Sequence, residues 1–598
     1  MCRIAGVLNK KLDTLQLETI VGKMCQLLQH GGPDDGGIAT FKNDNLVLGN
    51  RRLSLLDLTT AGHQPMQFTD RYTITFNGEL YNYLDLKAEL IAEGLQFKTN
   101  TDTEVVLAAF AKWNTKSFAK FNGMFAFALW DNEEKIIYLV RDAAGIKPLY
   151  YSTHTTALAF ASEIRAFAPL EYLSTKNENA SVFQLAYGYI PEPVTTLKNV
   201  QCLPKGCYYK YNANTNKGNL FSFNYFSFGN KINSEIDAKQ IIHKSLNNAV
   251  QRQMIADAPV GVFLSGGIDS AIIANLASSN SKKNVHTLSI YFNEENYSEK
   301  KYQDIVAQKI GSNHHSILLT ENEFHANFAD FMVAMDMPTC DGINTWFISK
   351  FAANEGLKAV LSGVGADELF GGYPSFDRIK KAKILAKLPK AVLLGLGNIN
   401  NKKLARLSYL KLGGIRGLYL FLRGHFNTKQ IAQQLGAYEK DVWNIIQNMP
   451  TSPILENCEA KNTASWLEYN LYMQDQLLKD ADIMSMAHGL EIRVPFLDNE
   501  VIESVFSINE NIKYAGKMPK QLLIKSFENI LPKEVWNRPK MGFSFPFAEW
   551  MKNSEFVNEL SHNNNNDYTK KACQDFLSGT LHWSRIMSLI VLKNKNLI

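Results

Sequence analysis

Hydrophobic residues in the first 210 positions occur mostly in short alternating or continuous runs that are bounded by Gly, Asn and Asp. Runs of this kind between turn-forming residues predict β-strands, which we expect at 70–76, 124–130, 136–140 and 158–162. Longer stretches with helical spacing of hydrophobic residues occur at 14–29, 83–93 and 103–112. The combination predicts strands packed against helices in a layered α+β domain.

The pattern changes after residues 206–235, a segment rich in Lys, Asn, Tyr and Gly that we expect to hold the last small strands and a linker. A helix is predicted at 236–254, and the continuous apolar run at 259–264 suits a buried parallel strand. Strand patterns then alternate with helical ones, which is typical of a doubly wound α/β sheet. These strands are expected at 286–291, 316–319 and 359–361, and the helices at 301–310 and 345–354.

From about residue 375 the pattern is mainly helical, and a polar run at 563–566 predicts a surface loop. The predicted domains are therefore residues 2–205 and residues 236–598, joined by the linker at 206–235. The length of 598 residues agrees with two domains, because it exceeds what a single hydrophobic core usually supports.

Composition narrows the class of protein. Hydrophobic and charged fractions of 45% and 20% are typical of soluble enzymes, and a net charge of +5 without basic blocks gives no support for nucleic-acid binding. Seven cysteines without regular spacing indicate free thiols in a reducing compartment. We recognise neither a membrane span of ~18 apolar residues nor a signal peptide. We therefore expect a cytoplasmic protein that binds neither nucleic acids nor membranes.

Cys2 directly follows the initiator methionine. If Met1 is removed, Cys2 carries both a thiol and a free α-amine, whose pKa of roughly 7.7–8.0 makes it a usable base near neutral pH. A nucleophile with a base beside it is a recurring arrangement in covalent catalysis. The alternative is that Cys2 is a small apolar residue that opens a strand.

Besides Cys2, three stretches of the first half, 50–54, 77–79 and 101–102, carry residues that fit the cleavage of an amide by a thiol. Asn77 offers a side-chain amide and Gly78 an unobstructed backbone N–H, and together they could stabilise an oxyanion. Arg52 could bind a substrate carboxylate through two hydrogen bonds, and Asp102 could bind an ammonium group. Alternatively, Asn77 and Gly78 form a hairpin turn, and Arg52 and Asp102 are surface charges.

Together with short matches at 4–6, 32–34, 52–54 and 77–79, these residues make the first half resemble the glutaminase domain of class II glutamine amidotransferases, which are N-terminal-nucleophile hydrolases. The resemblance implies that Cys2 attacks the glutamine amide, that its α-amine transfers the proton, and that Asn77 and Gly78 hold the oxyanion. The glutamine-binding residues that it implies are Arg52, Leu53, Ser54, Leu55, Leu56, Asn77, Gly78, Glu79 and Asp102. Gly31 departs from the family, which usually has Arg there, and we expect a looser loop without loss of catalysis.

The segment 265–270, Ser-Gly-Gly-Ile-Asp-Ser, lies between a predicted strand and a helical stretch. A glycine-containing turn at a helix N-terminus exposes N–H groups and the positive end of the helix dipole, which suits phosphate. Ser265 and Ser270 add hydroxyl groups, and Asp269 is suited to Mg²⁺. The segment lacks the lysine and the glycine spacing of the common nucleotide-binding loops. A plain strand–helix connection is the alternative.

This segment resembles the pyrophosphate loop of ATP pyrophosphatases, and the segments 361–373 and 485–498 resemble signatures of glutamine-hydrolysing asparagine synthetases. The resemblance implies that Asp269 and Asp367 bind magnesium pyrophosphate and that Lys520 stabilises charge during adenylation. The implied ATP-binding residues are Leu264, Ser265, Gly266, Gly267, Asp269, Ser270, Ile290, Ser362 and Gly363. Ile524 stands where an arginine is common, which weakens the assignment of Lys520.

The expected function is ATP-dependent amidation of aspartate to asparagine with glutamine as nitrogen donor, through a Cys2 thioester and an acyl-adenylate. Val364 replaces a glutamate that the family often uses in forming the adenylate, and Ile483 replaces a common Lys or Arg. A paralogue that amidates a different carboxylate, such as a sugar acid or a secondary-metabolite acid, is therefore the alternative, unless Val364 only packs against the sheet. The resemblance also suggests a homodimer. A tRNA-modifying enzyme and a non-catalytic interaction protein fit the charge distribution and the intact motifs less well.

Overall fold

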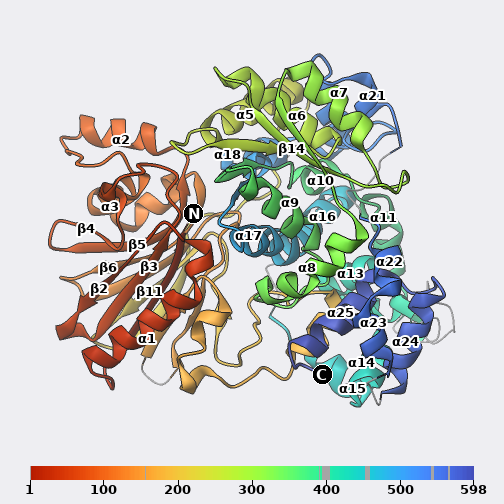
Figure 1. The fold of residues 1–598 in the computed structure, drawn as a ribbon, viewed down its shortest axis with the longest axis horizontal. Coiled ribbons are helices and arrows are strands. Elements are labelled where there is room, and N and C mark those ends of the chain that lie inside the picture. The colour runs from red at the N-terminus through yellow and green to blue at the C-terminus, as the bar shows by residue number, and fades with distance from the viewer. Residues whose placement is uncertain are drawn as a thin grey trace.

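The computed structural model describes residues 2–154, 157–229, 231–389, 391–393, 405–450, 458–539, 545–562 and 566–598. Apart from Asn566, the polar run predicted as a surface loop at 563–566 lies outside this part of the chain. Figure 1 shows the two predicted halves as two bodies of different architecture, with the N-terminal end of the first strand at their junction.

The N-terminal domain contains two antiparallel sheets of six strands each. The first has the order β10-β8-β9-β1-β3-β2, with β1 (Cys2–Asn9), β2 (Asp35–Phe41), β3 (Leu46–Arg52), β8 (Tyr150–Ser152), β9 (Ala157–Ala161) and β10 (Gln201–Cys202). The second has the order β12-β11-β7-β6-β5-β4, with β4 (Met66–Phe68), β5 (Tyr72–Leu80), β6 (Gly123–Asp131), β7 (Ile136–Arg141), β11 (Cys207–Asn212) and β12 (Lys217–Ser222). The small strands expected after residue 205 thus complete the second sheet.

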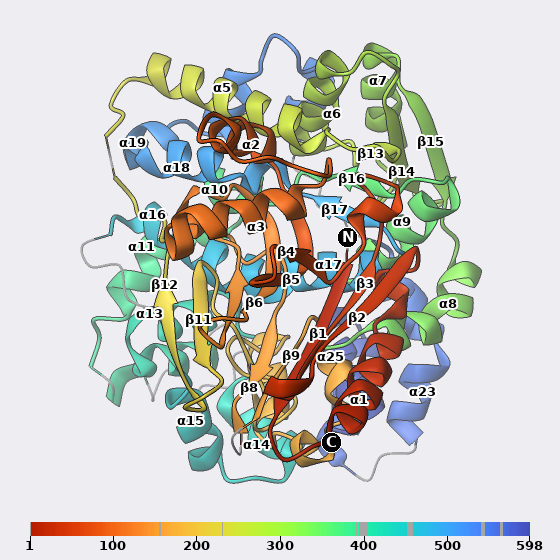
Figure 2. The same cartoon turned by 90° about the vertical axis from the view of Figure 1, so that its left-hand side faces the viewer.

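The two sheets pack face to face through side chains that alternate along the strands, such as Ile4 and Leu8 of β1 and Ala128 and Trp130 of β6. Helix α1 (Thr14–Leu27) covers the outer face of the first sheet. Helices α2 (Tyr83–Ala92) and α3 (Asp102–Trp113) cover that of the second. Figures 1 and 2 show these layers, with α3 and α1 on opposite sides of the paired sheets.

The C-terminal domain is built on a parallel five-stranded sheet of order β15-β14-β13-β16-β17. Its strands are β13 (Val260–Phe263), β14 (His286–Tyr291), β15 (Asn313–Leu318), β16 (Ala359–Leu361) and β17 (Glu491–Arg493). Helices lie on both faces of this sheet, among them α5 (Glu235–Gln253), α6 (Ile268–Asn280), α7 (Lys300–Ile310), α8 (Glu321–Ala334), α9 (Ile343–Asn354) and α10 (Ala366–Phe370). The topology confirms the predicted fold class: a layered antiparallel domain followed by a doubly wound α/β domain.

The C-terminal part is mainly helical, as predicted. Its longer helices are α11 (Ser375–Leu385), α13 (Gly414–Arg423), α14 (Thr428–Leu435), α15 (Glu439–Gln447), α16 (Ala460–Leu467), α17 (Leu478–Met486), α18 (Asn499–Ser507), α23 (Glu555–His562), α24 (Asp567–Leu577) and α25 (Trp583–Asn594). Helix α4 (Ala180–Tyr187) of the first domain also belongs to the hydrophobic cluster of this part. Short helices are α19 (Glu510–Lys513), α20 (Gln521–Ser526), α21 (Lys533–Trp536) and α22 (Phe547–Trp550). A ten-residue π-helical segment, Glu468–Leu477, joins α16 to α17 without a break.

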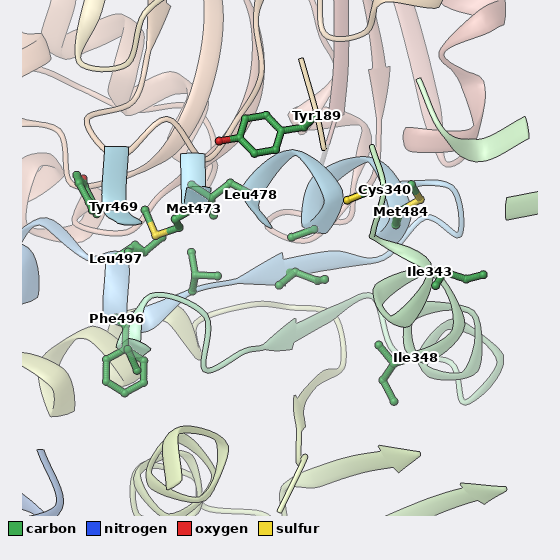
Figure 3. Packing of buried hydrophobic residues seen from close by; sticks show 14 of the residues in the cluster. Tyr189, Cys340, Ile343, Ile348, Tyr469, Met473, Leu478, Met484, Phe496 and Leu497 are labelled. Atoms are coloured by element: carbon green, nitrogen blue, oxygen red, sulfur yellow. The ribbon is translucent and has the colours of Figure 1, made fainter. Parts of the chain in front are cut away.

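One continuous hydrophobic cluster crosses the domain boundary and includes Leu53 of the first domain and Leu264 of the second. In Figure 3, Tyr189 approaches the π-helical segment and α17, which carry Met473 and Leu478. The Tyr189 hydroxyl lies 2.6 Å from the Tyr419 hydroxyl, so its polar end has a partner at this buried position. Within the described residues, no helix combines the length and hydrophobicity needed to cross a bilayer.

The packing between the two sheets generates a stability prediction. Trp130 is fully buried there, so Trp130→Ala removes its contacts and leaves a cavity. The free energy of unfolding of the N-terminal domain, measured by urea denaturation, should fall by about 3–5 kcal/mol. Leu15 is 73% exposed on α1, and Leu15→Ala should change the same quantity by no more than about 0.5 kcal/mol. Equal effects of the two substitutions would contradict this packing.

Candidate active sites

Cys2 lies at the start of β1, where the first sheet meets the second domain. Its strand register pairs it with Arg52 at the end of β3. The backbone nitrogen of Cys2 donates a hydrogen bond to Asn77 Oδ1 at 3.3 Å. In a chain without Met1, this nitrogen is the α-amine, so Asn77 holds the group that was predicted to act as the base.

Most of the residues predicted to bind glutamine line one small pocket beside Cys2. The predicted residues in its lining are Cys2, Arg52, Leu53, Leu55, Leu56, Gly78, Glu79 and Asp102. Ser54 and Asn77 are not in the lining, and the Ser54 backbone N–H donates to Asp34 Oδ2 at 2.8 Å. The residues that complete the pocket and were not predicted are Gly62, Gln64, Phe76, Thr101 and Thr103. Gln64 Oε1 accepts a hydrogen bond from the Phe76 N–H at 2.7 Å, a contact between distant segments that no local motif signals.

Asn77 and Gly78 lie inside β5, where they pair with Ala126 and Phe125 of β6. The alternative of a hairpin turn is therefore wrong. Gly78 has φ +152°, and a Cβ atom there would lie 2.1 Å from the carbonyl oxygen of Met124. Only glycine fits this position, which lets the backbone approach the Cys2 pocket closely.

Arg52 is buried, so its interpretation as a surface charge is wrong. Its Nη2 donates to the carbonyl oxygens of Leu56 and Asp57 at 3.1 and 2.6 Å, and Nη1 donates to that of Thr59 at 3.1 Å. Arg52 thus holds the loop that carries Leu55 and Leu56. Since both N–H groups of Nη2 already serve backbone carbonyls, a two-point bond to a substrate carboxylate would require this loop to rearrange.

Asp102 is also buried, at the first position of α3. Burial raises the pKa of its carboxyl to about 6, although the Leu80 N–H donates to Oδ2 at 2.8 Å and opposes the shift. Burial also raises the pKa of Glu79 well above its usual value, with contributions from the charges of Asp102 and Glu491. The pocket therefore holds carboxyl groups that favour a cationic ligand such as an ammonium group.

The Cys2 thiol is buried as well, and burial raises its pKa. A backbone hydrogen bond from Leu53 and the charge of Arg52 act in the opposite direction but do not reverse the shift. A thiol in this state needs a nearby base to become a nucleophile. The hydrogen bond that holds the Cys2 nitrogen at Asn77 Oδ1 places such a group within the same residue.

Arg493 of β17 connects the two domains and was not predicted as a site residue. Its Nη2 lies 3.8 Å from Glu79 Oε2, and its Nε donates to Glu491 Oε1 at 2.5 Å. Its Nη1 donates to the carbonyl oxygens of Gln253 and Ile255 at 2.7 and 2.8 Å. The backbone N–H of Ser362, at the second predicted site, donates to the carbonyl oxygen of Arg493 at 2.8 Å. One residue thus contacts the walls of both sites.

Gly31 accommodates a neighbouring side chain of this junction. A Cβ atom on Gly31 would lie 2.7 Å from Cγ of Arg3, whose Nε donates to Glu163 Oε1 at 2.6 Å. The segment around Gly31 forms a 3-10 turn, Gln29–Gly31. The expected looseness of this loop remains a prediction.

The second site lies at the carboxyl end of β13, where the segment 265–270 turns into α6. Ser265 and Ser270 brace the turn, with their Oγ atoms 3.0 Å apart and the Gly267 N–H donating to Ser265 Oγ at 3.3 Å. The Gly266 carbonyl accepts from Arg538 Nη2 at 3.0 Å, a contact that the sequence did not signal. The turn leaves the N-terminus of α6 open toward a cavity, as expected for phosphate binding.

Lys520 lies between the two predicted metal ligands. Its Nζ is 2.9 and 2.6 Å from the two carboxylate oxygens of Asp269, and 2.6 Å from Asp367 Oδ1. These two carboxylates raise the pKa of Lys520 against the effect of its burial. Because both carboxylates converge on one cationic group, their oxygens also fit Mg²⁺, which proteins often hold through one or two carboxylates plus substrate phosphates. No cluster of three or more His, Cys, Asp or Glu side chains suited to a metal occurs in the described ranges.

A cavity of about 1180 Å³ opens beside this loop and is larger than most single-ligand sites, which span about 300–1,000 Å³. The predicted residues that line it are Leu264, Ser265, Gly267, Asp269, Ser270, Ile290, Ser362, Gly363, Asp367 and Lys520. Gly363 allows a close approach of two loops, because a Cβ atom there would lie 2.8 Å from Cβ of Asp269. Val364 also lines the cavity, whereas Ile483 is buried and lies outside the lining.

Two family models match successive parts of the chain. The family model described as asparagine synthase matches residues 242–583, and the one described as a glutamine amidotransferase domain matches residues 1–223. Asparagine synthetase [glutamine-hydrolyzing] 1 of Bacillus subtilis is 31% identical, with 95% of this chain and 91% of the relative covered. Asparagine synthetase B of Escherichia coli is 27% identical, with 91% and 82% covered. A protein named amidase chry2 from Gibberella zeae is 25% identical, with 95% and 92% covered.

Among solved structures, B. subtilis glutamine phosphoribosylpyrophosphate amidotransferase overlaps with a TM-score of 0.30 at 14% identity, covering 54% of this chain and 92% of that one. The topology and the family matches define an amidotransferase, in which a part of the chain that carries Cys2 precedes a part that carries the loop 265–270. The chain belongs to the family of glutamine-hydrolysing asparagine synthases. It is therefore an enzyme of glutamine-dependent amidation.

The environment of Asp102 generates a pH prediction. If its carboxylate binds the ammonium group of glutamine, protonation below about pH 6 weakens binding, and KM for glutamine should rise about tenfold per pH unit there. Asp102→Asn should raise KM at pH 8 and remove this dependence. The same shift means that the carboxyl stabilises the fold below its ordinary pKa of 3.8, and that this contribution is lost as the pH rises through about 6. A KM that stays constant between pH 5 and pH 8 in the parent enzyme would exclude the role.

The position of Lys520 generates a metal prediction. Lys520→Met removes the ammonium group from between Asp269 and Asp367, so the two carboxylates should bind Mn²⁺ or Mg²⁺ several-fold more tightly in the absence of nucleotide. Isothermal titration calorimetry measures this affinity. Lys525→Met removes an exposed lysine that pairs with Glu235, and should leave it unchanged. Unaltered cation affinity in Lys520→Met would show that these carboxylates do not form the metal site.

Proposed function

We propose that this enzyme transfers nitrogen from glutamine to a carboxylate that it first activates with ATP, through a Cys2 thioester in one domain and an acyl-adenylate in the other. The observation that carries the proposal is the hydrogen bond between the Cys2 nitrogen and Asn77 Oδ1, beside the pocket that Cys2, Arg52 and Asp102 line. The proposal is further supported by Lys520, which lies between two carboxylates beside a phosphate-type loop.

In the first domain, Cys2 Sγ attacks the carboxamide carbon of glutamine. The thiol proton passes through the Cys2 α-amine to the leaving nitrogen, and ammonia departs as the thioester forms. The N–H of Gly78 and the side-chain amide of Asn77 would stabilise the oxyanion, while Asp102 binds the substrate ammonium. Water then hydrolyses the thioester, releases glutamate and returns the proton to sulfur.

In the second domain, an oxygen of the acceptor carboxylate attacks the α-phosphorus of ATP, and pyrophosphate leaves. Ammonia then attacks the carbonyl carbon of the acyl-adenylate, AMP leaves with the bonding electrons, and the nitrogen loses a proton. The N-terminus of α6 and Lys520 would stabilise the phosphate charge. Asp269 and Asp367 would hold Mg²⁺, which neutralises phosphate charge when bound.

Ammonia has to travel between the domains without being protonated. The hydrophobic cluster that contains Leu53 at the first pocket and Leu264 at the second cavity supports an apolar route. Charged groups flank this route at the domain junction. Among them, Lys147 Nζ lies 2.8 Å from Asp482 Oδ1.

Aspartate is one candidate acceptor, and asparagine would then be the product. The second candidate is another carboxylate, and the wall of the cavity favours it. Val364 presents an apolar side chain to the cavity, whereas Asp341, Glu368 and Asp480 present carboxyl groups. Amidation of the acceptor follows the same steps in either case.

Cys2→Ala tests the division of labour between the two domains. It should lower glutamine-dependent amidation at least ~10³-fold and leave the ammonia-dependent reaction within about twofold, because only the nucleophile is removed. Both are measured as AMP release with acceptor present. Cys25→Ala removes a buried thiol of α1 and should change neither activity. Loss of both activities in a folded Cys2→Ala enzyme would contradict the proposal, as would a mass spectrum of the active enzyme with Met1 retained.

A further inference from the structure

The part of the cavity away from the phosphate loop has an acidic wall. Asp341 precedes α9, Asp480 lies in α17, and Glu368 lies in α10, and all three line the cavity. Asp480 is 6% exposed and Glu368 is 1% exposed, and this burial raises the pKa of both carboxyl groups. Tyr373 and Tyr472 complete this region, with ring centroids 5.7 Å apart.

The two aspartates come from segments in direct contact. A Cβ atom on Gly342 would lie 3.2 Å from Cγ of Asp480, which brings the residue after Asp341 against α17. Asp480 Oδ2 accepts a hydrogen bond from Thr339 Oγ1 at 3.1 Å, and Asp341 Oδ1 accepts one from the Gly342 N–H at 2.9 Å. Within the described part of the chain, the second oxygen of each carboxylate has no hydrogen-bond donor. Both residues line the cavity, so these oxygens can accept hydrogen bonds from a ligand there.

The basic side chains nearest to this acidic wall form ion pairs with other residues. Lys479, which adjoins Asp480 in sequence, directs Nζ to Glu192 and Asp475 at 3.5 and 3.8 Å. Arg423 lies behind the two tyrosine rings and pairs with Glu468 at 2.6 Å.

Three of the four lysines that line the cavity direct Nζ to other groups. Lys520 pairs with Asp269 and Asp367, Lys461 donates to the Tyr514 carbonyl at 3.2 Å, and Lys513 donates to the Val505 carbonyl at 3.3 Å. The fourth, Lys517, lies three positions before Lys520 in the chain. Across the described ranges, no lysine or arginine forms an ion pair with Asp341, Glu368 or Asp480.

This arrangement disfavours an acceptor with two carboxylates. One carboxylate must reach the phosphate loop to be activated, and the other would then face Asp341 and Asp480 without a cation. The ammonium group of aspartate could bind one of these residues, but its remaining carboxylate would add an anion to a buried acidic region that already raises the pKa of Asp341 and Asp480. Hydroxyl or ammonium groups of an acceptor would instead donate hydrogen bonds to the second carboxylate oxygens of Asp341 and Asp480.

We propose that the acceptor is a carboxylic acid that presents hydrogen-bond donors, hydroxyl or ammonium groups, to Asp341 and Asp480 and carries no second carboxylate. This inference rests on the proposed adenylation and adds the class of acceptor to it. Asp341 and Asp480 act as specificity-determining residues, and the volume of the cavity leaves room for an acceptor larger than a four-carbon acid.

The test is ATP–pyrophosphate exchange by the full-length enzyme with Mg²⁺. Glucuronate serves as the hydroxyl-bearing acid, β-alanine as the ammonium-bearing acid, and aspartate and succinate as the dicarboxylates. At least one of the first two should give a kcat/KM at least tenfold above that for aspartate, and which one does so identifies the donor. If aspartate matches or exceeds both, the proposed function stands and this inference is overturned. If none of the acids supports exchange, the proposed adenylation fails and the inference fails with it.

A conservative substitution separates charge from folding. Asp480→Asn keeps the shape of the side chain and removes its charge, so the ratio of kcat/KM for the better donor-bearing acid to that for aspartate should fall at least tenfold. Asp441→Asn makes the same change on an exposed residue of α15 and should leave the ratio unchanged. An unchanged ratio in a folded Asp480→Asn enzyme would overturn the role of the acidic wall.

Discussion

The buried guanidinium of Arg493 is the interaction on which the arrangement of both sites depends. It lies between Glu79, at the glutamine pocket, and Glu491 in its own strand, and it also binds two backbone carbonyls of the second domain. A buried charge is costly unless its partners are in place. Separating the two domains would therefore leave Arg493 and Glu79 without each other, which is unfavourable. Since Ser362 donates its N–H to the Arg493 carbonyl, a shift of β17 would move the wall of the second site as well.

A second group of buried charges strengthens the same junction. Arg3, one residue after the nucleophile, pairs with Glu163 of its own domain at 2.6 Å and with Asp482 of α17 at 2.9 Å. Lys147 pairs with the other oxygen of Asp482 at 2.8 Å. Removing one partner of such a buried pair typically costs about 3–5 kcal/mol, because the other charge is left unpaired. The start of β1, and with it Cys2, is therefore fixed relative to the second domain by charge pairs and not only by hydrophobic contact.

Contiguous motifs were recognisable in the sequence because their residues act through neighbours in the chain. Three such motifs could be identified in this way: Cys2, the strand that carries Asn77, and the loop with Asp269. In the structure, Cys2 lines the first pocket and Asp269 lines the larger cavity. Residues whose role depends on contacts between distant segments gave no such signal. Arg493 belongs to a three-residue strand that is too short for a periodic pattern, and Arg538 reaches the loop from 272 positions away. The π-helical segment could not be predicted from the sequence either, because its geometry departs from the 3.6-residue period by which helices are recognised.

The two sites also differ in how they use buried carboxyl groups. At the glutamine pocket, Glu79 is balanced by Arg493, so the pocket combines negative and positive groups as a zwitterionic amino acid requires. At the wall formed by Asp341 and Asp480, the charge is of one sign. A site whose ionisable groups are all acidic selects its ligand in two ways: it attracts hydrogen-bond donors, and it excludes further carboxylates. The apolar side chain of Val364 on the same cavity then has a simple explanation: a cavity already lined by acidic side chains gains nothing from a further carboxylate near the reacting acid.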